Sequence, residues 1–182
     1  MPKQPELSVA LLRGVNVGGK NILPMKELAA LFVELGCRDV RTYIQSGNVV
    51  FRAAEPPRPE VLTARIAERF GIESPVILRT HSELAAVVTR HPFTPDPDGK
   101  LVHVMFLSGE PDADGMAKLD PRRSPPDEFA VIGLEIYLKT PQGAGNTKLT
   151  NAYFDSKLRV ISTGRNWRTV LKLLEMTSTD PE

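Results

Sequence analysis

The same order of elements is predicted twice along this chain, and this repeat restricts the possible folds more than any single motif. Apolar periodicity, glycine stops and turn residues predict strand, helix, strand, strand, helix, strand and a trailing helix in each half, with starts about 95 residues apart. In the first half, strands are expected at 7–12, 40–45, 48–52 and 75–79, and helices at 24–35, 60–70 and 82–90. In the second half, strands are expected at 101–107, 129–132, 134–139 and 159–163, and helices at 112–119, 146–158 and 166–176.

This order is that of the ferredoxin-like unit, so the predicted fold is α+β: two β-α-β-β-α-β units in tandem, with antiparallel sheets and helices on one face. Prolines between His91 and Pro97 mark the expected boundary. The predicted domains are residues 1–91 and 98–182, packed closely together, and 182 residues suit two such units. A single mixed sheet with helices on one face is the alternative fold for the same elements.

Composition excludes several classes of protein. Hydrophobic residues make up 41% of the chain and charged residues 25%, which is typical of a folded protein. No apolar run approaches the roughly 18 residues of a membrane span. Residues 1–6 lack the apolar stretch of a signal peptide, so a cytoplasmic location is expected. The net charge of +1 gives no reason to expect strong nonspecific affinity for nucleic acid or membrane.

Four strings carry a resemblance to a known family: LLRGVNVGGKN at 11–21, YIQSGNVVF at 43–51, NTKLTN at 146–151 and RNWRTV at 165–170. In this order and spacing the chain resembles the bacterial family of domain of unknown function 1697. The resemblance implies paired ferredoxin-like units, and it implies no activity.

The segment from Gly14 to Asn21 almost matches the phosphate-loop pattern G-x-x-x-x-G-K-[ST] and lies between a strand and a helix. Asn21 lacks the hydroxyl that holds Mg²⁺, and Pro24 delays the helix, so a nucleoside triphosphatase is not expected. Glycine amides flanked by Arg13 and Lys20 can still form an anion-binding nest; the structural alternative is a connection that needs glycine for its turns.

The link Ser46-Gly47 is predicted to be a two-residue hairpin turn.

A second glycine loop, at 142–148, is predicted to open a helix that Asn146 caps and that carries Lys148 in its first turn. The last helix is expected to place Trp167 on its apolar face and Arg165, Arg168 and Lys172 on a basic stripe. Residues 139–172 hold seven bases and one acid, whereas residues 96–128 hold eight acids and four bases. The basic segment is expected either to receive an anion or to be neutralised by the acidic one within the fold.

Searches for other chemistry give little. His81, His91 and His103 share no ligand spacing, so neither a metal site nor a cofactor is expected. Cys37, the sole cysteine, is predicted to be a small buried residue. The central strands lack the aromatic series of an RNA-recognition motif, so nucleic acid would have to use the loops and the basic helix.

The leading hypothesis is therefore a protein that binds a phosphate- or carboxylate-bearing small ligand or nucleotide at its glycine-rich basic loops. An enzyme acting on a phosphorylated or acyl substrate and a protein-interaction module are the alternatives. No catalytic residue is assigned. The predicted ligand-binding residues are Arg13, Asn16, Gly18, Gly19, Lys20, Asn146, Thr147, Lys148, Arg165, Asn166 and Arg168.

Overall fold

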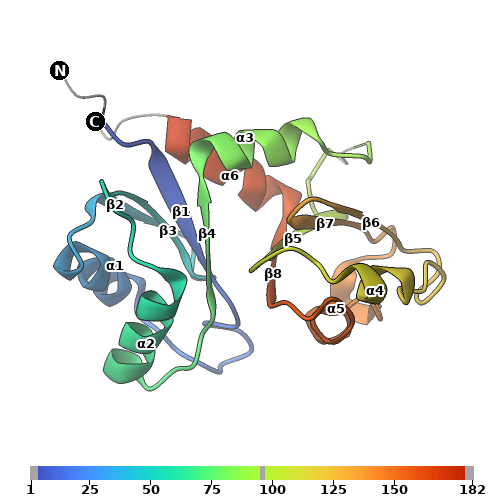
Figure 1. The fold of residues 1–182 in the computed structure, drawn as a ribbon, viewed down its shortest axis with the longest axis horizontal. Helices are drawn as coiled ribbons and strands as arrows, with labels where there is room; N and C mark the ends of the chain where they lie inside the picture. The colour runs from blue at the N-terminus through green and yellow to red at the C-terminus, as the bar shows by residue number, and fades with distance from the viewer. Residues whose placement is uncertain (1–3, 95–96, 179–182) are drawn as a thin grey trace. The chain divides into compact units, whose positions relative to one another are not determined.

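The structure is a computed structural model that describes residues 4–94 and 97–178, and its described part contains two four-stranded antiparallel sheets (Figure 1). The N-terminal start and residues 95 and 96 of the expected boundary lie outside the described residues. The chain divides into two compact units, the first comprising Met1–Ala85 and Leu173–Glu182 and the second Ala86–Lys172. The prediction of an α+β fold with two ferredoxin-like units is confirmed, and the single mixed sheet is wrong.

The first unit has the strand order β2-β3-β1-β4. Strand β1 lies in the middle and is buried throughout, in agreement with its apolar sequence. Its elements are β1 (Leu7–Leu12), α1 (Met25–Glu34), β2 (Arg38–Tyr43), β3 (Asn48–Arg52), α2 (Pro59–Phe70) and β4 (Val76–Thr80), with the start of α3 (His81–Thr89) following directly.

Helices α1 and α2 cover one face of the first sheet (Figure 1). Their apolar residues recur every three or four positions, and the strands supply alternate residues, because the two periods place one face of each element toward the core. The buried cluster includes Ala10, Leu12, Val49 and Phe51 from the strands and Leu28, Phe32, Leu62 and Ile66 from the helices.

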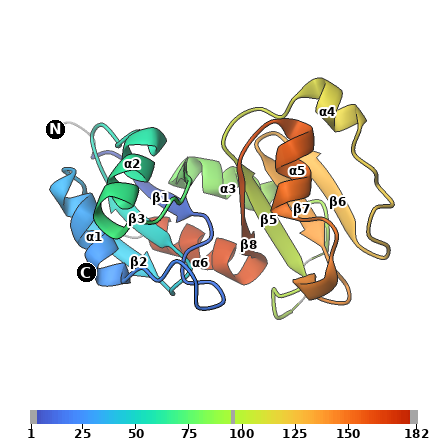
Figure 2. The same cartoon turned by 90° about the horizontal axis from the view of Figure 1, so that it is seen from below.

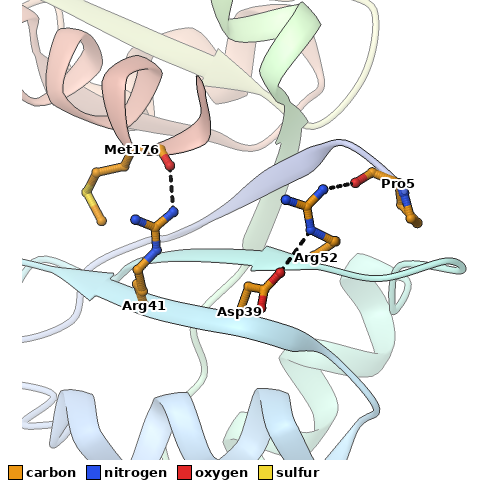
Figure 3. A network of polar contacts seen from close by, with 5 residues as sticks. All are labelled: Pro5, Asp39, Arg41, Arg52 and Met176. Atoms are coloured by element: carbon orange, nitrogen blue, oxygen red, sulfur yellow. Dashed lines mark hydrogen bonds and ion pairs between the residues drawn. The ribbon is translucent and has the colours of Figure 1, made fainter. Parts of the chain in front are cut away.

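Polar side chains from β2 and β3 make long-range contacts in the first unit (Figure 3). Arg52 forms an ion pair of 2.9 Å with Asp39 and donates a hydrogen bond to the carbonyl of Pro5. Arg41 donates to the carbonyl of Met176, in the final helix, at 2.7 Å. The two contacts of Arg52 offset the cost of burying its guanidinium, which is 6% exposed.

The second unit has the strand order β6-β7-β5-β8. Helix α5 (Asn151–Leu158) covers one face of this sheet (Figure 2). Its residues Tyr153, Phe154 and Leu158 belong to the same buried cluster as Met105, Leu107, Ile136 and Leu138 of the strands. Its elements are β5 (Val102–Leu107), α4 (Ala113–Ala117), β6 (Glu128–Ile132), β7 (Glu135–Lys139), the 3-10 turn η1 (Ala144–Asn146), α5 (Asn151–Leu158), β8 (Ser162–Asn166) and the start of α6 (Trp167–Ser178).

The hairpin between β2 and β3 differs from the prediction of a two-residue turn. Strand β2 ends at Tyr43, which pairs with Asn48, so the link is the four residues 44–47. Gly47 has the expected positive φ of 82°, but Ile44 also has a positive φ, 48°. The side chain of Asn48 holds this wider turn by donating to the carbonyl of Tyr43 and the hydroxyl of Ser46, both at 3.0 Å.

The end of the second unit also differs from the prediction. Helix α5 begins at Asn151 rather than at Asn146, because Thr150 caps it by accepting a hydrogen bond from the Tyr153 amide at 3.2 Å. Lys148 therefore precedes the helix and is not in its first turn. Arg165 lies in β8 opposite Val104, so the predicted helical stripe of Arg165, Arg168 and Lys172 is wrong.

Candidate functional site

The glycine loop of the first unit connects β1 to α1 through a tight turn. Gly18 and Gly19 have φ values of 57° and 73°, and the Lys20 amide donates to the carbonyl of Val17 at 2.9 Å. Two successive residues with positive φ make glycine the suitable residue at both places. The turn leaves Gly18, Gly19 and Lys20 exposed.

Two asparagines hold the base of this loop. Asn16 donates to the carbonyls of Leu23 and Gln45 at 3.0 and 2.6 Å and accepts from the Leu23 amide at 2.8 Å. Asn21 donates to the carbonyl of Gly14 at 2.8 Å. Both asparagines have positive φ, which this residue type tolerates better than most. The side chain of Asn16 therefore stabilises the base of the loop, and the exposed turn extends from this base.

The start of α1 agrees with the rejection of a phosphate loop. Pro24 is the N-cap and Met25 the first helical residue, so Lys20 is separated from the helix by 21–24. A phosphate held by Lys20 would not lie at the helix N-terminus, where the amides and the dipole favour an anion.

The second glycine loop is fastened to the segment before β6. The Lys148 amide donates to the hydroxyl of Ser124 at 3.0 Å, and Arg123 donates from Nε to the Lys148 carbonyl at 3.0 Å. The Arg123 guanidinium also lies over the Tyr153 ring, 4.1 Å from its centroid. The side chains of Arg123 and Lys148 are both exposed. The loop therefore brings a lysine beside an arginine that lies 25 residues earlier.

Thr147 and Asn146 occupy different positions in this loop. The Thr147 hydroxyl lies 3.4 Å from that of Ser124 and accepts from the Leu149 amide at 3.2 Å, so it helps to shape the segment. Asn146 is exposed at the end of η1 and does not cap α5.

The remaining predicted site residues lie around the end of β8. Asn166 caps α6 by accepting from the Thr169 amide at 2.9 Å. Arg168 is exposed, and its amide donates to the carbonyl of Gly99 at 3.4 Å. Trp167 is 4% exposed, which confirms its predicted place in a core.

Arg165 is deeply buried. Its exposure is 7%, and its guanidinium donates to the Thr163 hydroxyl at 3.0 Å and to the Gly164 carbonyl at 2.8 Å. Burial lowers the pKa of Arg165 to about 10, because removal from water disfavours the charged form. Its charge lies inside the second unit and not on the surface.

Strand register places the exposed cations of the second unit at one end of its sheet. Glu128 pairs with Lys139, Lys139 with Val102, and Asn166 with His103, so β5 and β6 start where β7 and β8 end. The segments attached there carry five exposed basic residues, and we call this region the basic end. They are Lys100, Arg122, Arg123, Lys148 and Arg168.

The basic end includes residues that sequence reasoning missed. Arg122 and Arg123 belong to the segment counted as acidic, so their proximity to Lys148 was hidden by the average charge. Their position in the sequence could have shown this proximity. Both arginines precede the predicted strand at 129–132, and its predicted hairpin partner at 134–139 ends just before the second glycine loop. Lys139 is paired with Glu128 at 3.7 Å, so the two oppositely charged segments do meet within the sheet.

Other potential chemical groups are occupied or buried. Cys37 is a free thiol with 3% exposure, as predicted, and burial raises its pKa to about 11. Asp155 accepts from the amide and hydroxyl of Ser162 at 2.9 and 2.7 Å. Within residues 4–94 and 97–178, no group of three or more His, Cys, Asp or Glu side chains could hold a metal ion.

Across the same described ranges, no helix has both the length and the apolar character to cross a membrane.

The fold defines a protein of two ferredoxin-like units in tandem, with exposed basic loops at defined strand ends. The chain belongs to the family described as protein of unknown function (DUF1697), whose model matches residues 6–137. It is also similar to a solved structure, the conserved bacterial protein SP0830 from Streptococcus pneumoniae, with a TM-score of 0.70 and 24% identity over 94% of this chain and 98% of that one. That likeness shows the fold alone. No curated protein matches significantly.

Proposed function

We propose that this protein binds a phosphate- or carboxylate-bearing ligand through its glycine-rich basic loops, with Lys148 and Arg168 at the basic end as the main contacts. The observation that carries the proposal is the gathering of exposed cations from separate connections at one end of the second sheet. Arginine and lysine form charge-assisted hydrogen bonds with phosphate and carboxylate oxygens, and these are stronger than neutral ones.

The local contacts support a site that is formed before the ligand arrives. Arg123 is held by the Lys148 carbonyl and the Tyr153 ring, so little side-chain freedom is lost when it meets an anion. Among the described residues, neither Lys148 nor Arg168 forms an ion pair with a carboxylate. Their charges are therefore available to a ligand.

Arg165 and Asn166 enter this proposal as positioning residues. Asn166 fixes the start of α6, and with it the backbone that carries Arg168. Arg165 is buried in the strand that leads to it. We expect Arg165→Ala to lower the free energy of unfolding, whereas a loss of binding with unchanged stability would make Arg165 a direct contact.

The glycine loop of the first unit is the second proposed binding element. Arg13, Gly18, Gly19 and Lys20 are the residues that would offer amides and charge, on the base that Asn16 fixes. The two loops belong to different units, and each is tested by itself. Lys20→Ala should weaken anion binding at the loop of the first unit, and Lys148→Ala should weaken it at the basic end.

The test is calorimetric titration of the intact protein with inorganic phosphate, pyrophosphate and citrate. Lys148→Ala and Arg168→Ala should each weaken binding about fivefold, which corresponds to about 1 kcal/mol for an exposed ionic contact. Lys157→Ala is the matched control, because this lysine lies in the last turn of α5, away from the basic end. Equal affinities for the wild type and the Lys148 and Arg168 variants, or no binding of any anion, would refute the proposal.

No observation among the described residues favours the enzymatic alternative. Asp155 is used to hold Ser162, and Cys37 is buried with a raised pKa.

The expected cytoplasmic location remains a proposal, and a free thiol such as Cys37 is compatible with a reducing compartment.

A further inference from the structure

We propose that the ligand of the basic end is a linear chain of phosphate groups, bound through its backbone and without regard to sequence. This inference rests on the proposed function and specifies its ligand. Phosphodiester chains of nucleic acid and inorganic polyphosphate share this chemistry, and the experiment below distinguishes them.

The first reason is that the cations of the basic end come from separate connections and not from one loop. The four strand ends follow the order β6-β7-β5-β8, and neighbouring strands lie about 4.8 Å apart, so the ends of β6 and β8 are separated by about 14 Å. Arg122 and Arg123 precede β6, whereas Arg168 follows β8. The connections that carry these cations are therefore attached at opposite edges of the sheet, and a ligand that reaches from one to the other is extended.

The second reason is that Arg123 is not free to swing toward Arg168. Its Nε donates to the Lys148 carbonyl, and its guanidinium lies over the Tyr153 ring. Arg168 is restrained at its own backbone, where its amide meets the carbonyl of Gly99. The pair Arg123 and Lys148 and the single Arg168 are therefore separate points of positive charge, suited to successive anionic groups.

Acidic residues at the same end are largely engaged. Glu128 pairs with Lys139 at 3.7 Å, and Asp127 accepts from the Ser124 hydroxyl at 2.8 Å. Asp120 accepts from the Arg122 amide at 2.9 Å. Asp98 is exposed near Gly99 and lowers the local potential beside Arg168. Hydrogen bonds to neutral groups leave Asp120 and Asp127 charged, so carboxylates reduce the positive potential near Arg123 as well as near Arg168.

The described aromatic residues of this region do not offer a stacking platform. Trp167 and Tyr153 are both buried, and Tyr153 is already covered by Arg123. Proteins that bind bases in single strands usually stack them on exposed aromatic rings. Contact with phosphates alone predicts weak dependence on base identity and strong dependence on salt.

The experiment measures binding of fluorescein-labelled oligouridylates of two, four and eight nucleotides by anisotropy, using the intact protein at 50 and 200 mM salt. For single strands the slope of log K against log salt is about −0.7 per neutralised phosphate. Two or more phosphates predict a loss of affinity of about sevenfold or more over this salt range, against about threefold for one phosphate. The eight-nucleotide strand should bind more tightly than the two-nucleotide strand, and oligoadenylate should match oligouridylate.

The variants Arg123→Ala and Arg168→Ala should each reduce the slope by about 0.7, whereas Lys157→Ala should not. Arg123→Lys keeps the charge and checks that the effect does not come from misfolding, with thermal unfolding measured for every variant. Competition against the labelled strand distinguishes the two sources, with inorganic polyphosphate and unlabelled oligouridylate of equal phosphate number as competitors. If polyphosphate displaces the labelled strand at the lower concentration, polyphosphate is the indicated ligand. If oligouridylate does so, nucleic acid is indicated.

Two results separate this inference from the proposed function. If inorganic phosphate binds with dependence on Lys148 but chain length has no effect on affinity or slope, the linear ligand is refuted and the anion site stands. If phosphate, pyrophosphate, citrate and every chain all fail to bind, both are refuted.

Discussion

The guanidinium of Arg41 donates a hydrogen bond of 2.7 Å to the backbone carbonyl of Met176, which lies 135 residues later in the chain (Figure 3). Met176 is in the last turn of α6, where carbonyls lack partners within the helix and the dipole favours a cation. Helix α6 has no basic residue of its own in that turn. Strand β2 therefore supplies the positive charge that the end of this helix needs.

Replacement of Arg41 by alanine should loosen the end of α6. A hydrogen bond to a charged group contributes about 1.5 to 3 kcal/mol, so we expect a loss of that order in the free energy of unfolding. Hydrogen exchange of residues 173–178 should become faster. The control is Arg38→Ala, an exposed arginine at the start of the same strand. Unchanged exchange in 173–178 would show that the bond does not hold the helix.

Asn16→Ala should destabilise the glycine loop of the first unit. The substitution removes three hydrogen bonds and places alanine at a φ of 53°, which together should cost about 2 kcal/mol. Urea unfolding and hydrogen exchange of residues 14–23 measure the effect. Asn16→Asp keeps the acceptor for the Leu23 amide, so its free energy of unfolding should lie between those of the wild type and Asn16→Ala. Lys20→Ala, at the exposed turn of the same loop, should leave stability unchanged.

Gly47→Ala and Gly14→Ala form a matched pair, because both glycines have positive φ, at 82° and 68°. A Cβ at Gly47 would lie 2.7 Å from atoms of Leu12 and Val15, whereas a Cβ at Gly14 meets nothing within 4 Å. We expect about 1 kcal/mol of destabilisation at Gly14 from backbone conformation. Gly47→Ala should cost about 1 to 3 kcal/mol more, from overpacking. Equal midpoints in urea would contradict this packing.

Cys37 predicts a pH dependence of stability above neutrality. Burial raises its pKa to about 11 in the folded protein, above the ordinary value near 8.5 that the unfolded chain has. Between these values the folded state binds more protons, so the free energy of unfolding falls as pH rises. Urea titrations from pH 7 to 11 should show a steeper fall for the wild type than for Cys37→Ala. If the free energy of unfolding falls equally with pH in the wild type and in Cys37→Ala, the pKa of the thiol is not raised in the folded protein.

The accuracy of the sequence predictions follows the strength of the apolar pattern. Strands β1 and β3 match their predicted bounds, because each is an unbroken buried run. Strand β8 was predicted at 159–163 but lies at Ser162–Asn166, since Ser-Thr-Gly-Arg-Asn contains no apolar side chain. Its burial is decided by pairing with β5, which hydropathy does not record.

The candidate site was harder to predict than the fold. Charge and position in loops predict Lys20, Lys148 and Arg168 as binding residues, and the structure shows that all three are exposed. The spacing of Arg165, Arg168 and Lys172 predicts a basic stripe on a helix, whereas the structure places Arg165 in β8 with 7% exposure. The contact between Arg123 and Lys148 joins two loops that are 25 residues apart, and a local sequence pattern does not predict such a contact.

The discontinuity of the first unit has a consequence for synthesis on the ribosome. That unit includes the chain from Leu173 onward, and Arg41 and His81 make contacts with Met176 and Thr177, the latter at 3.0 Å. These partners are translated after the whole second unit. Since translation runs from the N-terminus, the contacts of Arg41 and His81 with the final helix form only after that helix has left the exit tunnel, so the unit that is started first is completed last.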